Sequence, residues 1–411
     1  MKILLYGINY APELVGIGKY TGEMGAWLTM QGHEVRVITA PPYYPAWRVW
    51  SKFSKWFYSR SLESSATIWR CPLYVPSRPN SLLRILHLVS FALTSLPILI
   101  VQVVWKPNVV FLISPTLFCA PGALLLARLT GAISVLHIQD FEVDALFGLN
   151  QISLKSRTSI FEKIAFSFES LVLRGFNVVS TISSGMMQRA SDKGVTFTKL
   201  RFLPNWSDIT RFQKIEIDQS LLNRLGVPVN KKVILYSGNM GEKQGLENLV
   251  LAAQKLQIEE DLVFLLVGEG VSRNRLIKMT IDLKLDNIFF APLQSYEDLP
   301  ALLSSVDVHL VIQKRGVADV LLPSKLTNIL AVGGNVVITA DPSTTLGRLA
   351  VDHLGIALIV EPESVNALVG GIEKALNMPR PNHIAQAYAK KFLDKEEILS
   401  QFFGDIELTL Q

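Results

Sequence analysis

Short apolar runs recur along the chain, and stretches with helical spacing follow most of them. The runs are mostly apolar and do not show regular alternation with polar residues, which is typical of parallel strands buried on both faces. An alternation of strand and helix predicts parallel sheets with right-handed crossovers. We expect strands at 2–7, 35–39, 109–113, 134–138, 232–238, 262–267, 308–312 and 336–339.

The predicted strands form two sets that begin alike. Each set opens with a strand that ends in a glycine, Gly7 or Gly238, and continues through a glycine-containing loop into a helix. A chain of 411 residues, 49% of them hydrophobic, is long enough for two cores. The polar region from Pro204 to Lys231 is the expected boundary. We predict an α/β fold of two doubly wound, Rossmann-like domains, 1–205 and 206–389, which face each other across a cleft at the carboxyl ends of their strands.

The charge of the chain is unevenly distributed. Residues 1–205 contain 20 Lys and Arg against 10 Asp and Glu, whereas residues 206–411 contain 20 against 25. A basic half predicts a polyanionic partner, which is nucleic acid, an anionic lipid surface or a phosphorylated substrate. Cys71 and Cys119 cannot form a disulfide framework, and the first 30 residues do not resemble a signal peptide. We therefore expect a reducing, cytoplasmic setting.

The loop after the first strand resembles a dinucleotide fingerprint but departs from it. Thr21 stands where the third glycine belongs, and no acidic residue ends the strand at 35–39. A dehydrogenase is therefore disfavoured. Gly16 and Gly18 would still let the backbone approach a sugar or phosphate closely. A tight turn between strand and helix, without a ligand, is the alternative.

Two loops of the second half are candidates for binding a diphosphate. The first holds Gly238, Asn239 and Lys243 at the start of a helix, where backbone amides and the helix dipole favour an anion. The second holds Gly268 and Gly270 after another strand. Either loop could instead be an ordinary turn between strand and helix.

A third candidate segment follows the strand at 308–312. It contains Lys314 and Asp319, and Pro323, Ser324 and Lys325 then introduce an apolar helix. Free amides, a hydroxyl and an ammonium group at one helix start can hold a departing diphosphate without a metal. A solvated basic loop is the alternative. The sequence has no Asp-x-Asp pair and its six histidines form no ligand-spaced cluster, so we expect no metal.

Titratable residues gather at the end of the strand at 134–138. His137, Asp140, Glu142 and Asp144 lie there, where a base or an electrostatic partner for a cation-like transition state is expected. Asp140 is the preferred candidate. His137 could equally be a strand histidine with satisfied hydrogen bonds.

Two segments suggest contact with a membrane. Residues 43–60 interleave aromatic and basic side chains at helical spacing, which predicts an interfacial amphipathic helix carrying Trp47, Trp50, Lys52, Phe53, Lys55 and Phe57. Residues 85–105 contain no Lys, Arg, Asp or Glu and are nearly long enough to span a bilayer. Because they stand between strands of one sheet, we expect burial or surface docking of this segment and not a span.

Taken in order, these motifs resemble those of glycosyltransferase family 4, and within it the colanic-acid-type capsule enzymes. The resemblance covers nearly the whole chain, and the ordered combination of motifs is specific. The segments that carry it are 6–10, 16–21, 32–39, 204–206, 236–239, 242–248 and 323–328.

The resemblance implies a hexosyltransferase of the GT-B fold. It implies transfer with retention at the anomeric carbon, no metal or other cofactor, and a nucleotide-sugar donor held mainly by the C-terminal domain. For the colanic-acid-type enzymes it implies a GDP-fucose donor and a lipid-linked oligosaccharide acceptor in exopolysaccharide biosynthesis. It also implies that a final helix, at about 390–411, crosses back onto the N-terminal domain.

The chain departs from the family pattern at the donor site. Asn328 and Val320 stand where many members have two glutamates, and Asp319 is the candidate to replace the first. Lys243, Lys314 and Lys325 are the candidates to replace a missing Arg and Lys, at the positions of Asn239 and Gln244. The frequent catalytic histidine falls on Gln139, which leaves Asp140 beside it.

The residues and the resemblance together imply an enzyme that binds a nucleotide-sugar donor, a lipid-linked saccharide acceptor and, peripherally, the anionic inner face of the plasma membrane. A nucleotide-sugar 2-epimerase of the same fold and a non-catalytic sugar-binding module are the alternatives. Nucleic acid is disfavoured as a partner, because the aromatic residues fall at helical spacing and not on a recognisable RNA-binding sheet.

Overall fold

The computed structural model describes residues 1–13, 16–78, 80–147, 160–213, 217–316 and 324–410. The chain divides into two compact units, one of Met1–Leu203 with Gln401–Gln411 and one of Pro204–Ser400. The division at Leu203 lies two residues from the sequence-based boundary. The last helix, α16 (Lys395–Leu410), starts in the second unit, and only its residues from Gln401 onward belong to the first.

The first unit contains an eight-stranded sheet in the order β3-β4-β2-β1-β5-β6-β7-β8, in which only β3 and β4 pair antiparallel. The predicted strands in this half are confirmed to within a residue or two, whereas β3, β4, β7 and β8 were not predicted. The strands are β1 (Lys2–Tyr6), β2 (Glu34–Thr39), β3 (Ser59–Glu63), β4 (Ala66–Arg70), β5 (Val109–Ser114), β6 (Ile133–Ile138), β7 (Val178–Thr181) and β8 (Leu200–Phe202).

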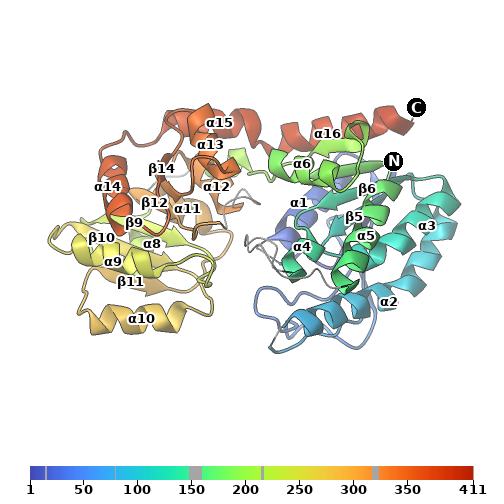
Figure 1. The fold of residues 1–411 in the computed structure, drawn as a ribbon, viewed down its shortest axis with the longest axis horizontal. Helices are drawn as coiled ribbons and strands as arrows, with labels where there is room; N and C mark the ends of the chain where they lie inside the picture. Colours follow the sequence, from blue (N-terminus) through green and yellow to red (C-terminus); the bar gives the residue numbers. More distant parts are fainter. Residues whose placement is uncertain (14–15, 79, 148–159, 214–216, 317–323, 411) are drawn as a thin grey trace. The chain divides into compact units, whose positions relative to one another are not determined.

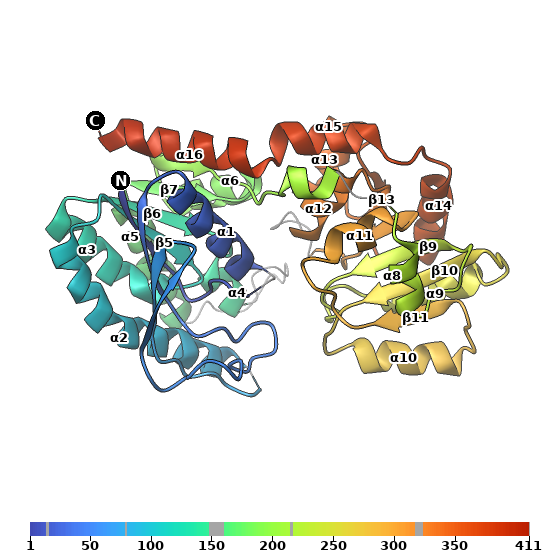
Figure 2. The same ribbon diagram turned by 180° about the vertical axis from the view of Figure 1, so that it is seen from behind.

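Helices cover both faces of this sheet, because successive side chains of a buried strand point to opposite sides. Leu5 faces α1 (Ile17–Met30), and Tyr6 faces α2 (Ser81–Trp105). Figure 2 shows α1 in front of the sheet, and Figure 1 shows α3 and α5 in front of it from the other side. The remaining helices of the unit are η1 (Leu117–Cys119), α3 (Ala120–Thr130), α4 (Glu142–Phe147), α5 (Ile160–Gly175), α6 (Ser184–Asp192) and η2 (Phe197–Lys199).

The end of α16 completes the core of the first unit. The rings of Phe402 and Phe403 lie 6.1 and 5.9 Å from the ring of Phe111 on β5. The ring of Trp27 on α1 lies 6.0 Å from Phe403. Aromatic packing of this kind explains why the last turns of the chain belong to the first sheet.

The second unit contains a six-stranded parallel sheet in the order β11-β10-β9-β12-β13-β14. Ile234 and Tyr236 of β9 pack with α9 and α14 on one face, and Val233 and Leu235 pack with α11, α12 and α15 on the other. The elements are α7 (Ile209–Gln213), α8 (Gln219–Arg224), β9 (Lys232–Ser237), α9 (Glu247–Lys255), β10 (Leu262–Val267), α10 (Arg273–Asp282), β11 (Ile288–Ala291), α11 (Leu299–Ser304), β12 (Val308–Val311), α12 (Ser324–Val332), β13 (Val336–Thr339), α13 (Thr345–Asp352), β14 (Leu358–Val360), α14 (Val365–Leu376) and α15 (His383–Phe392).

Both sheets are doubly wound, as predicted. In the first sheet the chain moves outward from β1 to β2 and later returns to β5, which pairs with the other edge of β1. In the second it moves from β9 to β10 and β11 and returns to β12. Such reversal points form a crevice beyond the carboxyl ends of the strands, where ligands of open α/β sheets bind. The loops after β1 and β5, and after β9 and β12, therefore lie at the positions where a ligand of each sheet is expected.

The interfacial helix predicted over residues 43–60 is wrong. The segment consists of turns and bends up to β3. Pro42 and Pro45 oppose a helix because proline lacks the amide hydrogen. Trp47 has a φ of 51°, and its ring packs 5.6 Å from Tyr43 and 5.2 Å from His87. Trp47 therefore packs within the first unit and is not presented to a membrane by a helix.

Candidate functional site

The loops after β9 and β10 touch through their backbones. A β-carbon on Gly268 would lie 2.0 Å from the carbonyl oxygen of Gly238, and one on Gly270 would lie 2.4 Å from that of Met240. The amide of Gly238 donates to the carbonyl of Val267 at 2.9 Å. Gly268 and Gly270 are therefore needed for the close approach of the two loops, which accounts for them without a ligand.

Lys325 lies beside Gly238 at the reversal point of the second sheet. Its ammonium nitrogen lies 4.1 Å from the centre of the Tyr236 ring and 3.8 Å from the place of a β-carbon on Gly238. Burial of the ammonium group lowers its pKa to about 7, although the residue as a whole keeps some exposure. Within the described residues Lys325 forms no ion pair. The structure thus brings together two predicted site residues that are far apart in the sequence.

Two further lysines lie nearby: Lys243 in the loop after β9 and Lys314 in the loop after β12. The amide of Lys314 donates to the carbonyl of Lys243 at 3.0 Å, and its side chain covers Gly245, where a β-carbon would lie 2.9 Å from Lys314 Cγ. No described carboxylate pairs with Lys243 or Lys314, whereas Arg315 pairs with Asp341 and Glu361 at 2.8 and 2.9 Å. The positive charge available to a ligand here therefore comes from lysines.

Asn239 takes part in this site through its backbone carbonyl. Its carbonyl accepts a hydrogen bond of 2.7 Å from the Tyr236 hydroxyl, and its side chain is exposed. This bond ties the loop after β9 to the strand beneath it. The ring that faces Lys325 is thereby fixed in place.

The remaining residues predicted to bind the donor either lie outside the described residues or have structural partners. Asp319, Pro323 and the side chain of Ser324 lie outside the described residues, although Ser324 starts α12 as expected. Asn328 is buried, and its Oδ1 accepts a hydrogen bond of 2.9 Å from the hydroxyl of Ser207. Asn328 therefore joins α12 to the segment that follows Pro204, a structural role that the sequence did not indicate.

In the first unit, the glycine loop after β1 is built around Glu13. This buried carboxylate accepts bonds of 2.9 Å from the amides of Tyr43 and Tyr44 and from the side-chain amide of Asn9. Burial nevertheless raises the pKa of Glu13. A β-carbon on Gly18 would lie 2.6 Å from that of Glu13. The position of Glu13 therefore requires a glycine at residue 18, and no sequence motif indicates this role of Glu13.

Gly16 is favoured by its backbone conformation and not, like Gly18, by crowding around the position of a β-carbon. Its φ is 62°, a left-handed value that favours glycine, and the nearest neighbour of a β-carbon there would be the Tyr44 ring at 3.7 Å. Gly16 comes directly before α1 and keeps some exposure. Of the two predicted glycines in this loop, Gly16 is the one whose backbone a ligand could approach.

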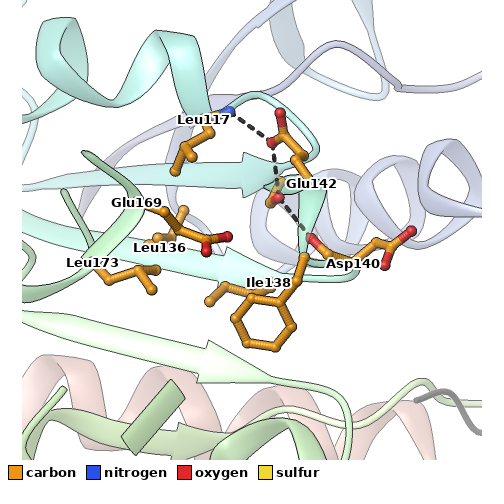
Figure 3. Close-up of a pocket in the computed structure, with 9 residues that line it drawn as sticks. Leu117, Leu136, Ile138, Asp140, Glu142, Glu169 and Leu173 are labelled. Carbon is orange, nitrogen blue, oxygen red and sulfur yellow. Dashed lines mark hydrogen bonds between the residues drawn. The ribbon is translucent and has the colours of Figure 1, made fainter. Parts of the chain in front are cut away.

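The cluster after β6 contains buried groups with structural partners and one partly exposed carboxylate, that of Asp140. His137 is buried with ring nitrogens 3.0 Å from the Ser180 hydroxyl and 2.9 Å from the Gln139 amide, and burial lowers its pKa to about 3. It is a satisfied strand histidine, which was the alternative interpretation. Asp140 keeps some exposure, and in Figure 3 its carboxylate points away from those of Glu142 and Glu169.

Glu142 holds the backbone that carries Asp140. Its Oε1 accepts from the Leu117 amide at 2.7 Å and lies 3.0 Å from the Ser114 hydroxyl, which itself lies 3.0 Å from the Asp140 carbonyl (Figure 3). Burial raises the pKa of Glu142 to about 7. The adjoining cavity, of about 10 Å³, is large enough for one water molecule but not for a sugar.

The six residues predicted to face a membrane or acceptor lie in three places. Trp50, Lys52 and Phe53 line a hollow of about 380 Å³ with Pro12 and Ser51. Trp47 packs on Tyr43 and His87, as described above. Lys55 and Phe57 are exposed near Trp56, with the Lys55 ammonium 4.9 Å from the Trp56 ring. The described residues include no group of three or more His, Cys, Asp or Glu side chains that could hold a metal ion.

Comparison with known proteins agrees with this architecture. Residues 15–206 match the glycosyl transferase 4-like domain, and residues 218–392 match the glycosyl transferases group 1. The chain is 56% identical over 409 residues to WcaI of Escherichia coli K12, a protein assigned by name as a colanic acid biosynthesis glycosyl transferase, covering 99% of this chain and 100% of that protein.

Solved structures share the fold at low sequence identity. Sucrose-phosphate synthase from Thermosynechococcus elongatus matches with a TM-score of 0.74 and 15% identity, covering 100% of this chain and 99% of that one. HepE of Anabaena in complex with UDP matches with a TM-score of 0.69 and 14% identity, covering 99% and 100%. The two doubly wound units, the two matched domains and the extent of the identity to WcaI lead to one conclusion: the chain belongs to glycosyltransferase family 4 and is a glycosyltransferase of the GT-B fold.

Proposed function

We propose that this glycosyltransferase transfers fucose from GDP-fucose to a lipid-linked oligosaccharide in colanic acid or a related exopolysaccharide. The name of the relative WcaI supports the polysaccharide, and the presence of UDP in the HepE structure supports a nucleotide-sugar donor. One observation supports the donor site above others. It is the position of Lys325 beside Gly238 at the reversal point of the second sheet, with no described carboxylate to neutralise it.

In this proposal the second unit holds the donor diphosphate. Lys325 and Lys314 stabilise the negative charge that develops on the diphosphate as the glycosidic bond breaks. A lysine that is partly desolvated before the ligand arrives is well suited to this role, because an anion restores favourable interactions of its charged form. No metal is required for the step, and the loop after β9 contributes backbone amides.

The acceptor binds to the first unit in this proposal. The oxygen of the departing diphosphate takes the proton of the acceptor hydroxyl on the same face of the sugar, which gives retention without a dedicated nucleophile. Asp140 stabilises the cation-like transition state. The hollow of Trp50, Lys52 and Phe53 is the proposed acceptor pocket, since it offers aromatic faces and one cation to a phosphorylated saccharide. The enzyme acts in the cytoplasm at the inner face of the plasma membrane.

A panel of nucleotide-sugars tests the donor. GDP-fucose at about 100 times its dissociation constant stabilises the protein by about 2.7 kcal/mol and raises the melting temperature, whereas a UDP-sugar at the same concentration does not. Stabilisation by UDP-sugars alone would contradict the guanine nucleotide.

A second measurement tests the reaction. Release of GDP is expected to require a fucose acceptor carried on a lipid diphosphate. Conversion of the donor sugar without an acceptor would instead identify a nucleotide-sugar 2-epimerase. Lys374, an exposed lysine of the same unit, provides a control: Lys374→Ala is expected to behave as the parent in both assays.

A further inference from the structure

A row of large apolar side chains is exposed along the whole of α2. Their spacing of three, four or seven residues places them on one face of the helix. Leu93, Ile100 and Val104 are 62%, 68% and 86% exposed. The helix is also long and apolar enough to cross a membrane by length and composition. The row, named here the α2 stripe, consists of Leu82, Leu86, Leu93, Leu96, Ile100 and Val104.

The opposite face of α2 is fixed to the first sheet by polar contacts. The Ser95 hydroxyl lies 2.5 Å from that of Tyr6, Arg36 donates to Gln102 at 3.1 Å, and the Trp105 ring nitrogen donates to Glu34 at 2.6 Å. Removing α2 from the sheet would break these bonds and leave the buried hydroxyl of Tyr6 and the buried amide of Gln102 without these partners. The folded unit can therefore expose α2 side-on to an apolar phase but cannot send it across a bilayer.

The exposed apolar surface continues onto the neighbouring helix. Leu125 and Leu129 of α3 are exposed, and Gly122 of α3 allows close packing of α2, since its β-carbon would lie 2.9 Å from Leu99. α3 in turn contacts α5, and the three helices lie side by side in Figure 1. An exposed apolar surface that covers more than one helix marks a site of interaction.

The charged side chains of α2, α3 and the segments next to them are basic. No Asp or Glu occurs between Glu63 and Asp140, a stretch that includes all of α2 and α3. Arg78, Arg84, Lys106 and Arg128 in this stretch are exposed, whereas Arg70 is buried and pairs with Glu63. Such a surface is complementary to an anionic partner. A second copy docked by the same face would bring like charges together, because a two-fold contact pairs each patch with itself.

Exposed aromatic side chains lie beside the α2 stripe. The Tyr58 hydroxyl donates to the carbonyl of Thr94 at 2.8 Å, which anchors the segment before β3 to the middle of α2. Trp56 and Phe57 in this segment are 71% and 74% exposed. Aromatic rings next to cations and an apolar helix face are typical of side chains at the level of lipid headgroups.

We propose that the α2–α3 face docks on an anionic lipid bilayer, with α2 in the plane of the interface and the α2 stripe among the acyl chains. The proposal rests on the peripheral membrane location proposed above and names the surface responsible. It replaces the helix expected at 43–60 as the main contact. Of the residues predicted for that helix, only Lys55 and Phe57 remain beside the docking face.

Flotation of the full chain with lipid vesicles tests the proposal. The parent is expected to float with vesicles of phosphatidylcholine and phosphatidylglycerol and less with phosphatidylcholine alone. The triple variant Leu93→Gln, Ile100→Gln, Val104→Gln is expected to partition at least about tenfold less, since it removes apolar area without adding charge. Its three positions are exposed, so its melting temperature is expected to stay close to that of the parent.

The second unit supplies a matched control. Val271, Ile281 and Leu354 are 81%, 69% and 80% exposed, and their triple glutamine variant is expected to float as the parent does. Equal flotation of the parent and the α2 variant would overturn the proposal. So would a parent that fails to float and instead forms a dimer that the α2 variant abolishes in sedimentation equilibrium.

The donor proposal is tested separately on the same samples. Stabilisation of the α2 variant by GDP-fucose in the absence of lipid is expected to equal that of the parent. If the parent binds the donor but does not float under any condition, the docking surface is wrong and the sugar-transfer proposal stands. If the parent floats but binds no nucleotide-sugar, the docking surface stands and the sugar-transfer proposal is wrong.

Discussion

The ammonium nitrogen of Lys325 lies 4.1 Å from the centre of the Tyr236 ring, at a place where no described carboxylate pairs with it. A cation over an aromatic face is attracted by the ring, but this interaction is weaker than a buried ion pair. The ammonium is therefore held in position without being neutralised. That arrangement favours an incoming anion and makes Lys325 the residue on which the donor site can be tested most directly.

Lys325→Ala is expected to lower kcat/KM at least about 100-fold, because a preorganised charge at a developing anion contributes this much in comparable sites. Steady-state kinetics with GDP-fucose and acceptor measure the effect. Tyr236→Phe keeps the ring but loses the bond to the Asn239 carbonyl, and a smaller loss is expected. Lys374→Ala is the control for removal of a lysine charge. Turnover of Lys325→Ala within a few-fold of the parent would exclude the proposed role.

Binding of GDP is expected to weaken as the pH rises through about 7. The pKa of Lys325 is lowered to about 7, so the free enzyme carries the charge below this pH and loses it above. Because the diphosphate prefers the charged form, affinity should fall by about tenfold for each pH unit above the pKa. Titration calorimetry between pH 6 and 9 measures this, and Lys325→Arg should flatten the profile. A parent profile as flat as that of the arginine variant would contradict the assignment.

The acceptor pocket makes a prediction about KM. Trp50→Ala and Lys52→Ala alter the hollow of about 380 Å³ but lie outside the donor site, so the KM for acceptor is expected to rise while that for donor stays unchanged. Two-substrate kinetics separate the two. Trp47→Ala is the contrasting variant: its ring packs on Tyr43 and His87, so a loss of stability is expected instead. If Trp50→Ala raised the KM for the donor and left that for the acceptor unchanged, the hollow would not be the acceptor pocket.

The central strands could be predicted because each consists mainly of apolar residues, as strands buried on both faces do. β3 could not, since its sequence Ser59–Glu63 is polar and it lies at the edge of the sheet. The helix predicted over residues 43–60 was wrong because the contacts of this segment are not visible in its sequence. Its aromatic spacing is helical, but the partners of Trp47 are Tyr43 and His87, and His87 lies on a helix distant in sequence.

In the candidate site, too, contacts that depend on the folded chain could not be predicted from the sequence. The meeting of Lys325 and Gly238 could be anticipated, because both follow strands on either side of one reversal point. Glu13 could not, since its role depends on the amides of Tyr43 and Tyr44, which only the folded loop brings to it. Asn328 was assigned to the donor from its position in a motif, and its buried partner Ser207 lies beyond the reach of any motif.

Gly268→Ala is expected to destabilise the second unit by at least about 3 kcal/mol, because it combines a left-handed backbone with a clash against a backbone carbonyl. The φ of Gly268 is 146°, and the β-carbon would lie 2.0 Å from the Gly238 oxygen. Gly370→Ala in α14 is the matched control, since nothing lies within 4 Å of its β-carbon. It should stabilise by about 0.5–1 kcal/mol. Urea midpoints compare the two, and an unaffected Gly268→Ala would show that the loops are not rigidly joined.

Glu142→Gln is expected to stabilise the protein at alkaline pH. The folded-state pKa of Glu142 is about 7, above its ordinary value of 4.5, mainly because of burial. Between these values the folded state keeps a proton that the unfolded state releases, so stability falls as the pH rises through this window. Glutamine remains uncharged and retains an oxygen for the Leu117 amide. The difference in urea midpoint should therefore grow in favour of the variant from pH 5 to 8.

Glu169→Gln provides the contrast for this last experiment. Glu169 is also buried with a raised pKa, but it pairs with Lys193, which lies 3.2 Å from Asp144 as well. Neutralising Glu169 removes the cost of burying its charge but also removes a partner of Lys193, so the gain of this variant at pH 8 is expected to be smaller than that of Glu142→Gln. If Glu142→Gln instead lost stability relative to the parent from pH 5 to 8, the folded-state pKa of Glu142 would not be raised above its ordinary value. The carboxyl that fixes the backbone near Asp140 would then be ionised across the whole pH range of the experiment.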